Sequence, residues 1–468
     1  MMTHGSAARR RRQRATIAAA IPSARRLLKG QDHGEPISVS GRDVGVTGDR
    51  WVEPFLAANM AGLRRLELRH EVRADPTVRL LLKPGSRIGA LPLLSPATRK
   101  VAAGLLIEPR FRWESLGAVF NAIGFSVEPE LGGAPLVPGS AREVPPWMLA
   151  GPVIERIAGL LRHRRRGFVE RSETRASPRG RVEWTTWATK QVPRGSWSTF
   201  PCRFSEPVDD PDLMASIRWT LGRLKENLST IAWSPPAKHL LHRTAELESQ
   251  VGPGILRRPS VEWLRAGDSA WVVAALEAMG WVAEERGLGG SRSLDGLAWD
   301  LSIDAVWEAW VTAFSADLAR SLGMTASPFQ AARRPLPWQG PVQSMGALVP
   351  DVELRGANRV IWIDAKYKAH LDLLSRRGWT GLSEETQSAH RADLHQALAY
   401  ASLSDAPQVD SLLLYPHLAT HRPSSGTVAT VTSGRRRVRL VLAAVPFGYR
   451  NPEQKEQCLR SFRELLAA

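Results

Sequence analysis

The residues best suited to chemistry lie in one short segment, residues 360–368, which reads VIWIDAKYK. Side chains alternate between the two faces of a strand, so one face of this segment carries Trp362, Asp364, Lys366 and Lys368. A carboxylate and an ammonium group therefore project side by side from the end of a buried strand. The same pattern also occurs as an ion pair on protein surfaces, and Lys368 can equally be a solvent-exposed residue at the strand end.

Lysine usage marks the same segment. Only nine of the 63 basic residues are lysines, and between Lys238 and Lys455 the only two are Lys366 and Lys368. The lysine ammonium is a compact point charge, whereas the arginine guanidinium is a planar fork of donors. A chain that otherwise uses arginine therefore has a chemically different cation beside Asp364.

A second carboxylate precedes this strand. Asp351 follows Pro350, and the sequence Arg355-Gly356-Ala357-Asn358 predicts a hairpin connection between extended segments at 347–354 and 359–368. Mg²⁺ binds oxygen ligands and keeps several waters, so Asp351, Asp364 and the backbone carbonyl of Ala365 can hold it, with Mn²⁺ as a substitute. Lys366 can then orient a metal-bound water and stabilise negative charge that develops on a phosphate.

Two helices are expected to frame these strands. Apolar spacing predicts a helix over 304–322 with Glu308 close beside its buried face, and a second over 393–401 with Gln396 and Tyr400 one turn apart. For Tyr400 the alternative is simple packing in a protein core. An α/β core is completed by strands expected at 412–416 and 438–445 and by a closing helix at 454–466.

Three of these motifs resemble the Pro-Asp…(Asp/Glu)-x-Lys nuclease superfamily. They are Pro350-Asp351, Asp364-Ala365-Lys366 and the helix with Gln396 and Tyr400, which is similar to the Gln-x-x-x-Tyr motif of RecB-like and related members. The resemblance implies that residues 296–468 form a restriction-endonuclease-like domain with a mixed central sheet flanked by helices. It also implies that the glutamine lies near the metal site and the tyrosine near the DNA.

A closer resemblance covers most of the chain. The strings DAKYK at 364–368, DLHQALAYA at 393–401 and LLLYP at 412–416 look like McrC, the nuclease subunit of the McrBC modification-dependent restriction systems. Glu308 matches that family's helix-borne glutamate, whereas His395 and Ala397 replace the aromatic residue and methionine usual around the glutamine. Upstream strings follow the family's order, and they are GFVER at 167–171, RGRV at 179–182 and CRF at 202–204.

The resemblance to McrC implies a function and a partner. The function is Mg²⁺-dependent cleavage of DNA that carries modified cytosines, in defence against foreign DNA. The partner is a separate AAA+ GTPase ring of the McrB type, into which the N-terminal part of McrC inserts and whose GTP hydrolysis it stimulates. The Gly-rich segment at 287–291 lacks the lysine of a P-loop, so this chain itself is not expected to bind a nucleotide.

Composition limits the class of protein. Of the 468 residues, 43% are hydrophobic and 23% charged, which is typical of a folded protein. With only two cysteines and no apolar run near the ~20 residues that span a bilayer, the expected location is the cytoplasm and no membrane role is expected. The net charge of +17 favours a nucleic-acid partner, although residues 1–30 carry eight basic and no acidic residues, which leaves +9 for the rest.

The chain is expected to have four parts. Residues 1–40 form a basic, disordered tail, either a DNA-contacting arm or a solvated extension; residues 41–150 form a β-rich, partner-binding module interrupted by Pro and Gly. Residues 151–290 are mostly helical, and a linker at Gly287–Gly290 precedes the nuclease domain at 296–468. Residues 41–290 should therefore bind and stimulate the AAA+ partner, while the metal site lies entirely in 296–468.

Two other functions stay open. One is a stand-alone RecB-like DNA repair nuclease, against which a neighbouring gene for an AAA+ GTPase would argue. The other is a non-catalytic adaptor that keeps the nuclease fold only to hold DNA or the partner. The presence of Asp351, Asp364 and Lys366 together argues against the adaptor, because a protein without catalysis has no chemical need for all three.

Overall fold

The chain forms two compact units. The first combines residues 1–145, 234–236 and 294–468, and the second combines residues 146–233 and 237–293. The computed structural model describes residues 26–74, 77–132, 135–140, 143–164, 166–260, 269–284, 295–328, 332–336, 339, 345–368, 370–417, 426–433 and 436–467. The predicted linker at Gly287–Gly290 and residues 1–25 of the predicted tail lie outside the described residues.

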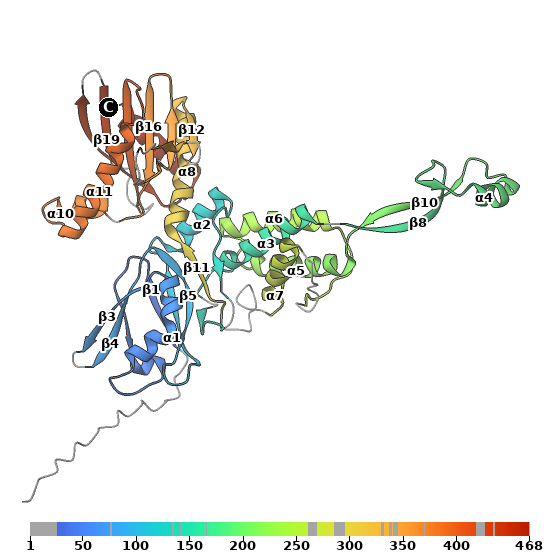
Figure 1. Ribbon diagram of the computed structural model, residues 1–468, viewed down its shortest axis with the longest axis horizontal. Helices are drawn as coiled ribbons and strands as arrows, with labels where there is room; N and C mark the ends of the chain where they lie inside the picture. Colours follow the sequence, from blue (N-terminus) through green and yellow to red (C-terminus); the bar gives the residue numbers. More distant parts are fainter. Residues whose placement is uncertain are drawn as a thin grey trace, which may run out of the picture. The chain divides into compact units, whose positions relative to one another are not determined.

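The N-terminal part of the first unit is rich in strands (Figure 1). They form one sheet in the order β1-β6-β5-β11-β7 and a smaller sheet in the order β2-β4-β3. The elements are β1 (Arg26–Gln31), β2 (Ile37–Ser40), α1 (Val52–Arg65), β3 (Arg69–Ala74), β4 (Val78–Lys83), β5 (Arg87–Leu94), β6 (Val101–Glu108), α2 (Arg112–Ile123), β7 (Glu130–Leu131) and β11 (Trp299–Ser302).

Strand β11 joins this sheet from a distant part of the sequence. It pairs antiparallel with β5 on one side and with β7 on the other. Gly89 in β5 has φ +155°, and a Cβ added there would lie 2.2 Å from the carbonyl oxygen of Trp299. Only glycine permits this close approach of two backbones. The fully buried Asp300 of β11 forms ion pairs with Arg65 and Arg87, which ties the strand to its neighbours.

The C-terminal part of the first unit is built on a mixed sheet in the order β12-β15-β16-β17-β19-β18. β15 and β16 form an antiparallel hairpin, as predicted, and β16, β17 and β19 run parallel. The elements are α8 (Ile303–Leu322), β12 (Thr325–Pro328), β13 (Arg334–Pro335), β14 (Ala347–Leu348), β15 (Val352–Arg355), β16 (Arg359–Ala365), α10 (His370–Arg377), α11 (Glu384–Ala401), β17 (Gln408–His417), β18 (Gly426–Ser433), β19 (Arg436–Pro446) and α12 (Pro452–Ala467).

The two predicted helices that frame the strands form for local reasons. Helix α8 begins after Ser302, whose hydroxyl accepts the N–H of Ala305 at 3.3 Å, and ends at Gly323 in the left-handed conformation. Helix α11 begins after Ser383, whose hydroxyl accepts the N–H of Thr386 at 3.3 Å. Helix α8 contacts β12, β15 and β16, and α11 packs on β16, β17 and β19. The mixed α/β class predicted from the sequence is thereby confirmed.

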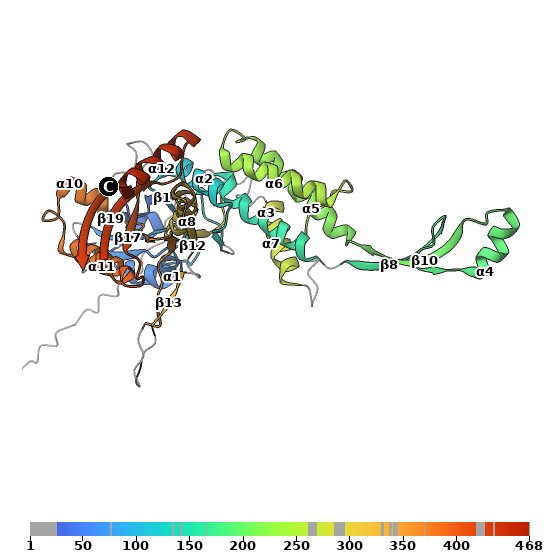
Figure 2. The same cartoon turned by 90° about the horizontal axis from the view of Figure 1, so that it is seen from above.

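The second unit consists of helices and one long hairpin. Helix α5 begins at Pro211, and the carboxylate of Asp210 accepts the N–H groups of Asp212 and Leu213, as its sequence predicts. The β8–β10 ribbon extends away from the helices of this unit (Figure 2). The elements are α3 (Pro146–His163), β8 (Gly167–Arg175), β9 (Arg181–Val182), α4 (Trp184–Thr186), β10 (Phe200–Val208), α5 (Pro211–Ser229), α6 (Pro235–Val251) and α7 (Ala270–Ala283).

The structure differs from the expected boundaries at two places. Strands β1 and β2 lie inside the segment expected to be a disordered tail, because β1 pairs in parallel with β6 and β2 pairs with β4. Strand β11 lies inside the segment expected to belong to the nuclease domain alone. Both cysteines are buried and neither forms a disulfide, and none of the helices in the described residues is long and apolar enough to cross a membrane.

Candidate active site

The strand pattern at the end of β16 places Asp364 and Lys366 together. Asp364 is 4% exposed, and its Oδ2 lies 2.5 Å from the ammonium nitrogen of Lys366. Burial raises the pKa of Asp364 above its usual value, although the adjacent Lys366 ammonium acts in the opposite direction. Sequence alternation had predicted this shared face, and Trp362 on the same face packs against Tyr400 of α11.

Asp351 lies directly before β15 and faces the end of β16. Its Oδ2 accepts the backbone N–H of Ala365 at 2.7 Å, so the hairpin brings the two predicted carboxylates to the same strand end. Burial and the negative charge of Asp364 raise the pKa of Asp351 to about 7, against the opposing effect of the Ala365 N–H. A buried carboxylate whose proton affinity is raised by a neighbouring carboxylate is a suitable environment for a cation.

Gln396 holds the lysine in place from helix α11. Its Oε1 accepts a hydrogen bond from the Lys366 ammonium at 2.9 Å, and its Nε2 donates to the Tyr400 hydroxyl at 2.5 Å. The Tyr400 hydroxyl in turn donates to the carbonyl of Val349 at 3.0 Å. The predicted pair one turn apart on α11 therefore connects the site lysine to the segment that carries Asp351.

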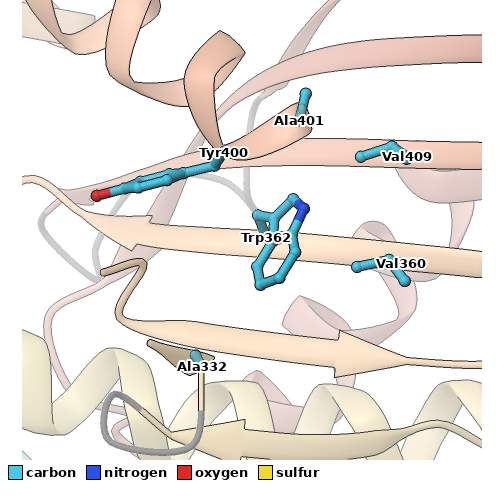
Figure 3. Packing of buried hydrophobic residues seen from close by; sticks show 6 residues of the cluster. All are labelled: Ala332, Val360, Trp362, Tyr400, Ala401 and Val409. Atoms are coloured by element: carbon cyan, nitrogen blue, oxygen red, sulfur yellow. The ribbon is translucent and has the colours of Figure 1, made fainter. Parts of the chain in front are cut away.

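The surroundings of Tyr400 do not match the DNA-contact role that was predicted for it. It is 3% exposed and packs with Trp362 and Val360 (Figure 3). Burial raises the pKa of its hydroxyl above the usual value, so this group stays protonated and acts as a hydrogen-bond donor and acceptor. The core alternative is the one that this structure favours, because the phenol ring has almost no surface left for DNA.

Asp393 is a site residue that sequence reasoning missed. Its two carboxylate oxygens accept hydrogen bonds from the Lys368 ammonium at 2.8 and 3.0 Å, and its Oδ1 lies 3.9 Å from the Lys366 nitrogen. Lys368 is therefore an ion-pair partner of α11 and not simply a solvent-exposed residue. The available signal was the spacing of Asp393 and Gln396, which are three residues apart and so share a helix face.

Glu308 lies on α8 with an exposed side chain. Partial burial of its carboxylate, together with the negative charges of Asp304 and Asp364, raises its pKa above the usual value. The charges that act on Glu308 include both Asp364 and Lys366, which brings it into the electrostatic surroundings of the site. No hydrogen bond joins its carboxylate to Asp351, Asp364 or Lys366 among the described contacts.

The donor set fits a hard divalent cation. Asp364 Oδ2 is buried and, among the described residues, has no hydrogen-bond donor apart from its ion pair with Lys366. One oxygen of Asp351 accepts the Ala365 N–H. Mg²⁺ is typically held by one or two carboxylates, and waters complete its coordination shell. The described part of the chain contains no cluster of three or more His, Cys, Asp or Glu side chains arranged as a metal cage. Asp351 and Asp364 are the two carboxylates that could hold such an ion together with water, and the Ala365 carbonyl stays a predicted ligand.

The fold and the site together define a mixed α/β domain with a carboxylate–lysine centre at the end of its central strand hairpin. No protein-family model matches the chain, and no curated protein matches its sequence. Among solved structures, it is similar to a chain of the refined half-complex from a tetradecameric assembly of Thermococcus gammatolerans McrB AAA+ hexamers with bound McrC. That similarity covers 94% of this chain and 100% of the other, with 13% identity and a TM-score of 0.43.

A second similarity is to a chain of the cryo-EM structure of the Thermococcus gammatolerans McrBC complex. It covers 62% of this chain and 88% of the other, with 14% identity and a TM-score of 0.23. Both solved structures are of McrBC complexes.

Proposed function

We propose that this chain is the Mg²⁺-dependent DNA endonuclease subunit of a McrBC-like restriction system. Its restriction-endonuclease-like domain is the sheet of β15–β19 with α8, α11 and α12. The observation that carries the proposal is the meeting of Asp351, Asp364 and Lys366 at one strand end, with the lysine held by Gln396. The sequence resemblance to McrC supports the substrate, which is DNA with modified cytosines.

Each site residue has a defined task in phosphodiester hydrolysis. Asp351 and Asp364 would hold Mg²⁺, and Mn²⁺ is expected to substitute for it. The ion, when bound, supplies a more acidic water and neutralises charge on the phosphate. The Lys366 ammonium, anchored between Asp364 and Gln396, donates a hydrogen bond to an oxygen on which negative charge develops. Gln396 keeps that ammonium aimed at the site, and Glu308 adds negative charge nearby.

The partner proposed from the sequence resemblance is an AAA+ GTPase ring of the McrB type. The β8–β10 ribbon is the surface that best fits a large protein partner, because it exposes bulky aromatic side chains that a solitary protein normally buries. Phe168 is 74% exposed, Trp184 59% and Trp197 65%. This ribbon lies within residues 41–290, which are expected to suffice for partner binding, but outside the module 41–150 to which partner binding was assigned.

The test uses the full chain with any AAA+ GTPase that is found encoded beside its gene, GTP, Mg²⁺ and methylated plasmid DNA. Wild-type chain should cut the plasmid, whereas Asp364→Ala and Lys366→Ala should lower the cleavage rate by about 10²-fold or more, because each removes a group that acts on charge in the transition state. Stimulation of GTP hydrolysis should be unchanged in both variants. Lys455→Ala, at a lysine paired with Asp317 on α8, is the control and should cut normally.

The outcomes separate the three functions. Cleavage by a folded Asp364→Ala or Lys366→Ala variant at the wild-type rate would show that the site assignment is wrong. Cleavage by the wild-type chain without any partner would favour a stand-alone repair nuclease. If the wild-type chain stimulates GTP hydrolysis but leaves every DNA intact, the chain is an adaptor that keeps the nuclease fold.

A further inference from the structure

The residue between the two site lysines, Tyr367, has no task in the proposed chemistry. It is 3% exposed, and its hydroxyl donates a hydrogen bond of 2.6 Å to Oδ2 of Asp32, a residue 335 positions earlier in the sequence. Lys366 and Lys368 both contact α11, through Gln396 and Asp393. The short segment after β16 therefore sends its two lysines towards α11 and its tyrosine towards the N-terminal sheet.

Asp32 is itself held firmly by the N-terminal sheet. It follows β1, is 0% exposed, and donates its backbone N–H to the carbonyl of Glu108 at the end of β6, at 3.1 Å. Its Oδ1 accepts the backbone N–H of Arg110 at 2.6 Å, while Oδ2 accepts the hydroxyl of Tyr367. A fully buried carboxylate is costly unless it is hydrogen-bonded and paired with a cation. Here each oxygen of the Asp32 carboxylate accepts a hydrogen bond, so the orientation of the carboxylate is fixed.

Arg110 closes the contact from the other side. Its Nε donates to the Tyr367 hydroxyl at 3.3 Å and lies 3.5 Å from Oδ2 of Asp32. Its guanidinium carbon lies 4.3 Å from the centre of the Tyr367 ring, a cation–π distance. Phe111 adds an edge-on ring contact to Tyr367 at 6.0 Å and stacks on Phe447 at 4.9 Å. Tyr367 is therefore fixed at its ring and at its hydroxyl.

Fixing Tyr367 also fixes the lysine next to it. The backbone N–H of Lys366 donates to the carbonyl of Leu414 in β17 at 2.8 Å, and the N–H of Lys368 donates to the carbonyl of Lys366 at 2.9 Å. The second bond closes a tight turn centred on Tyr367. A displacement of the Tyr367 backbone would therefore displace Lys366 from Asp364 and Gln396.

We propose that Asp32, Arg110 and Tyr367 form a positioning contact through which the N-terminal sheet holds Lys366 in its productive place, an inference that rests on the proposed nuclease function. The three are positioning residues, because none of them touches the groups that would bind the metal or the DNA. Their removal should lower the turnover number without weakening the binding of DNA or of the AAA+ partner. The cleavage centre is then complete only when the N-terminal sheet is in place.

The test compares Tyr367→Phe with Tyr449→Phe in the full chain. Tyr449 is a matched control, since its hydroxyl is also buried but lies beside Cys458 of α12. With the AAA+ partner present, Tyr367→Phe should lower kcat at least about tenfold, as small misplacements of catalytic groups do, with KM for DNA and GTPase stimulation unchanged. Tyr449→Phe should match the wild type in all three measurements.

Amide hydrogen exchange gives a second readout that needs no cleavage. The peptide that covers residues 364–368 should exchange at least about tenfold faster in Tyr367→Phe than in wild type or Tyr449→Phe, because the turn loses its anchor. Asp32→Ala removes both accepting oxygens and should behave like Tyr367→Phe, whereas Asp32→Asn keeps the size of the side chain and one accepting oxygen and should lower kcat by less.

These outcomes keep the inference separate from the proposed function. If the wild-type chain cuts DNA and Tyr367→Phe cuts equally fast, the positioning contact is refuted and the nuclease function stands. If the wild-type chain never cuts DNA, the proposed function fails, and unchanged exchange of residues 364–368 in Tyr367→Phe would then refute the contact as well. Loss of kcat in Asp32→Asn equal to that in Asp32→Ala would also count against it, because the accepting oxygen that asparagine keeps would then have no effect on cleavage.

Discussion

At the scale of single residues, the site depends on carboxylates that are kept close together at some cost. Asp351 has a pKa of about 7, because burial and the charge of Asp364 oppose its ionisation. Burial raises the pKa of Asp364 in the same way, and the Lys366 ammonium opposes that shift. The neighbouring protein groups compensate the negative charge of the two ionised carboxylates only in part. A divalent cation would stabilise the ionised forms of both carboxylates.

The pKa of Asp351 gives a pH prediction with a definite sign. Because the folded chain holds this proton more tightly than the unfolded chain, the metal-free protein should lose stability as the pH rises from about 4 to about 8. Metal binding needs the ionised carboxylate, so the rise in Tm on adding Mg²⁺ should be small near pH 6 and larger near pH 8. Thermal unfolding with and without Mg²⁺ across this range measures both effects.

Two variants control this measurement. Asp351→Asn should raise the Tm of the metal-free protein near pH 8 and abolish most of the Mg²⁺ effect, because the amide carries no charge. Asp405→Asn, at an exposed position outside the site, should behave as the wild type does. A Mg²⁺ effect of equal size near pH 6 and near pH 8 in the wild type would contradict the assigned role of Asp351.

At the scale of secondary-structure elements, β11 decides how the chain is divided. It lies directly before α8, which carries Glu308, yet it is a strand of the N-terminal sheet between β5 and β7. A cut between residues 290 and 296 would remove β11 from that sheet and leave its backbone donors unpaired in the C-terminal fragment. The same cut would separate Tyr367 from Asp32 and Arg110. This arrangement therefore does not favour the expectation that residues 296–468 form a self-contained domain.

The close approach of β5 and β11 can be tested by adding one methyl group. A Cβ at Gly89 would meet the Trp299 carbonyl oxygen at 2.2 Å and Asp300 Cα at 2.7 Å, so Gly89→Ala should force the strands apart. We expect a loss of about 2–3 kcal/mol in the free energy of unfolding, measured by urea denaturation. Gly346→Ala, where an added Cβ meets nothing within 4 Å, should change stability little. Equal stability of the two variants would argue against β11 as a strand of this sheet.

At the scale of the whole molecule, the proposed function makes charge the main determinant of the encounter with DNA. The net charge is +17, and six of the basic residues lie in residues 1–25. The two remaining cations of the expected tail are in β1 and are already paired, Arg26 with Asp43 at 3.1 Å and Lys29 with Glu143 at 2.6 Å. Residues 26–30 therefore belong to the sheet, and deletion of residues 1–30 would damage it.

Deletion of residues 1–25 should weaken nonspecific DNA binding in a salt-dependent way. If all six cations contact phosphates, the slope of log affinity against log salt should become less steep by about five, because each contact releases roughly 0.9 counterions. Fluorescence anisotropy with a labelled duplex over a salt series measures the slope. An unchanged slope would show that the tail does not contact DNA, and a solvated extension would then be the correct interpretation.

The sequence by itself determined the local features of the site. Alternation along β16 predicted that Asp364 and Lys366 share a face, turn residues predicted the β15–β16 hairpin that brings Asp351 near, and apolar spacing predicted α8 and α11. These features depend on residues close together in the chain, whose geometry follows from the periods of a strand and a helix. The metal, the nuclease activity and the AAA+ partner stay predictions of the residue types and of the family resemblance.

Only the tertiary structure decided the long-range partners. Nothing in the local pattern around Tyr367 indicates that its hydroxyl meets Asp32, or that β11 pairs with β5 and β7. Tyr400 likewise became a core residue because Trp362 and Val360 cover its ring. The physical reason is that a periodic pattern specifies which side of an element is buried, but the path of the whole chain specifies what buries it.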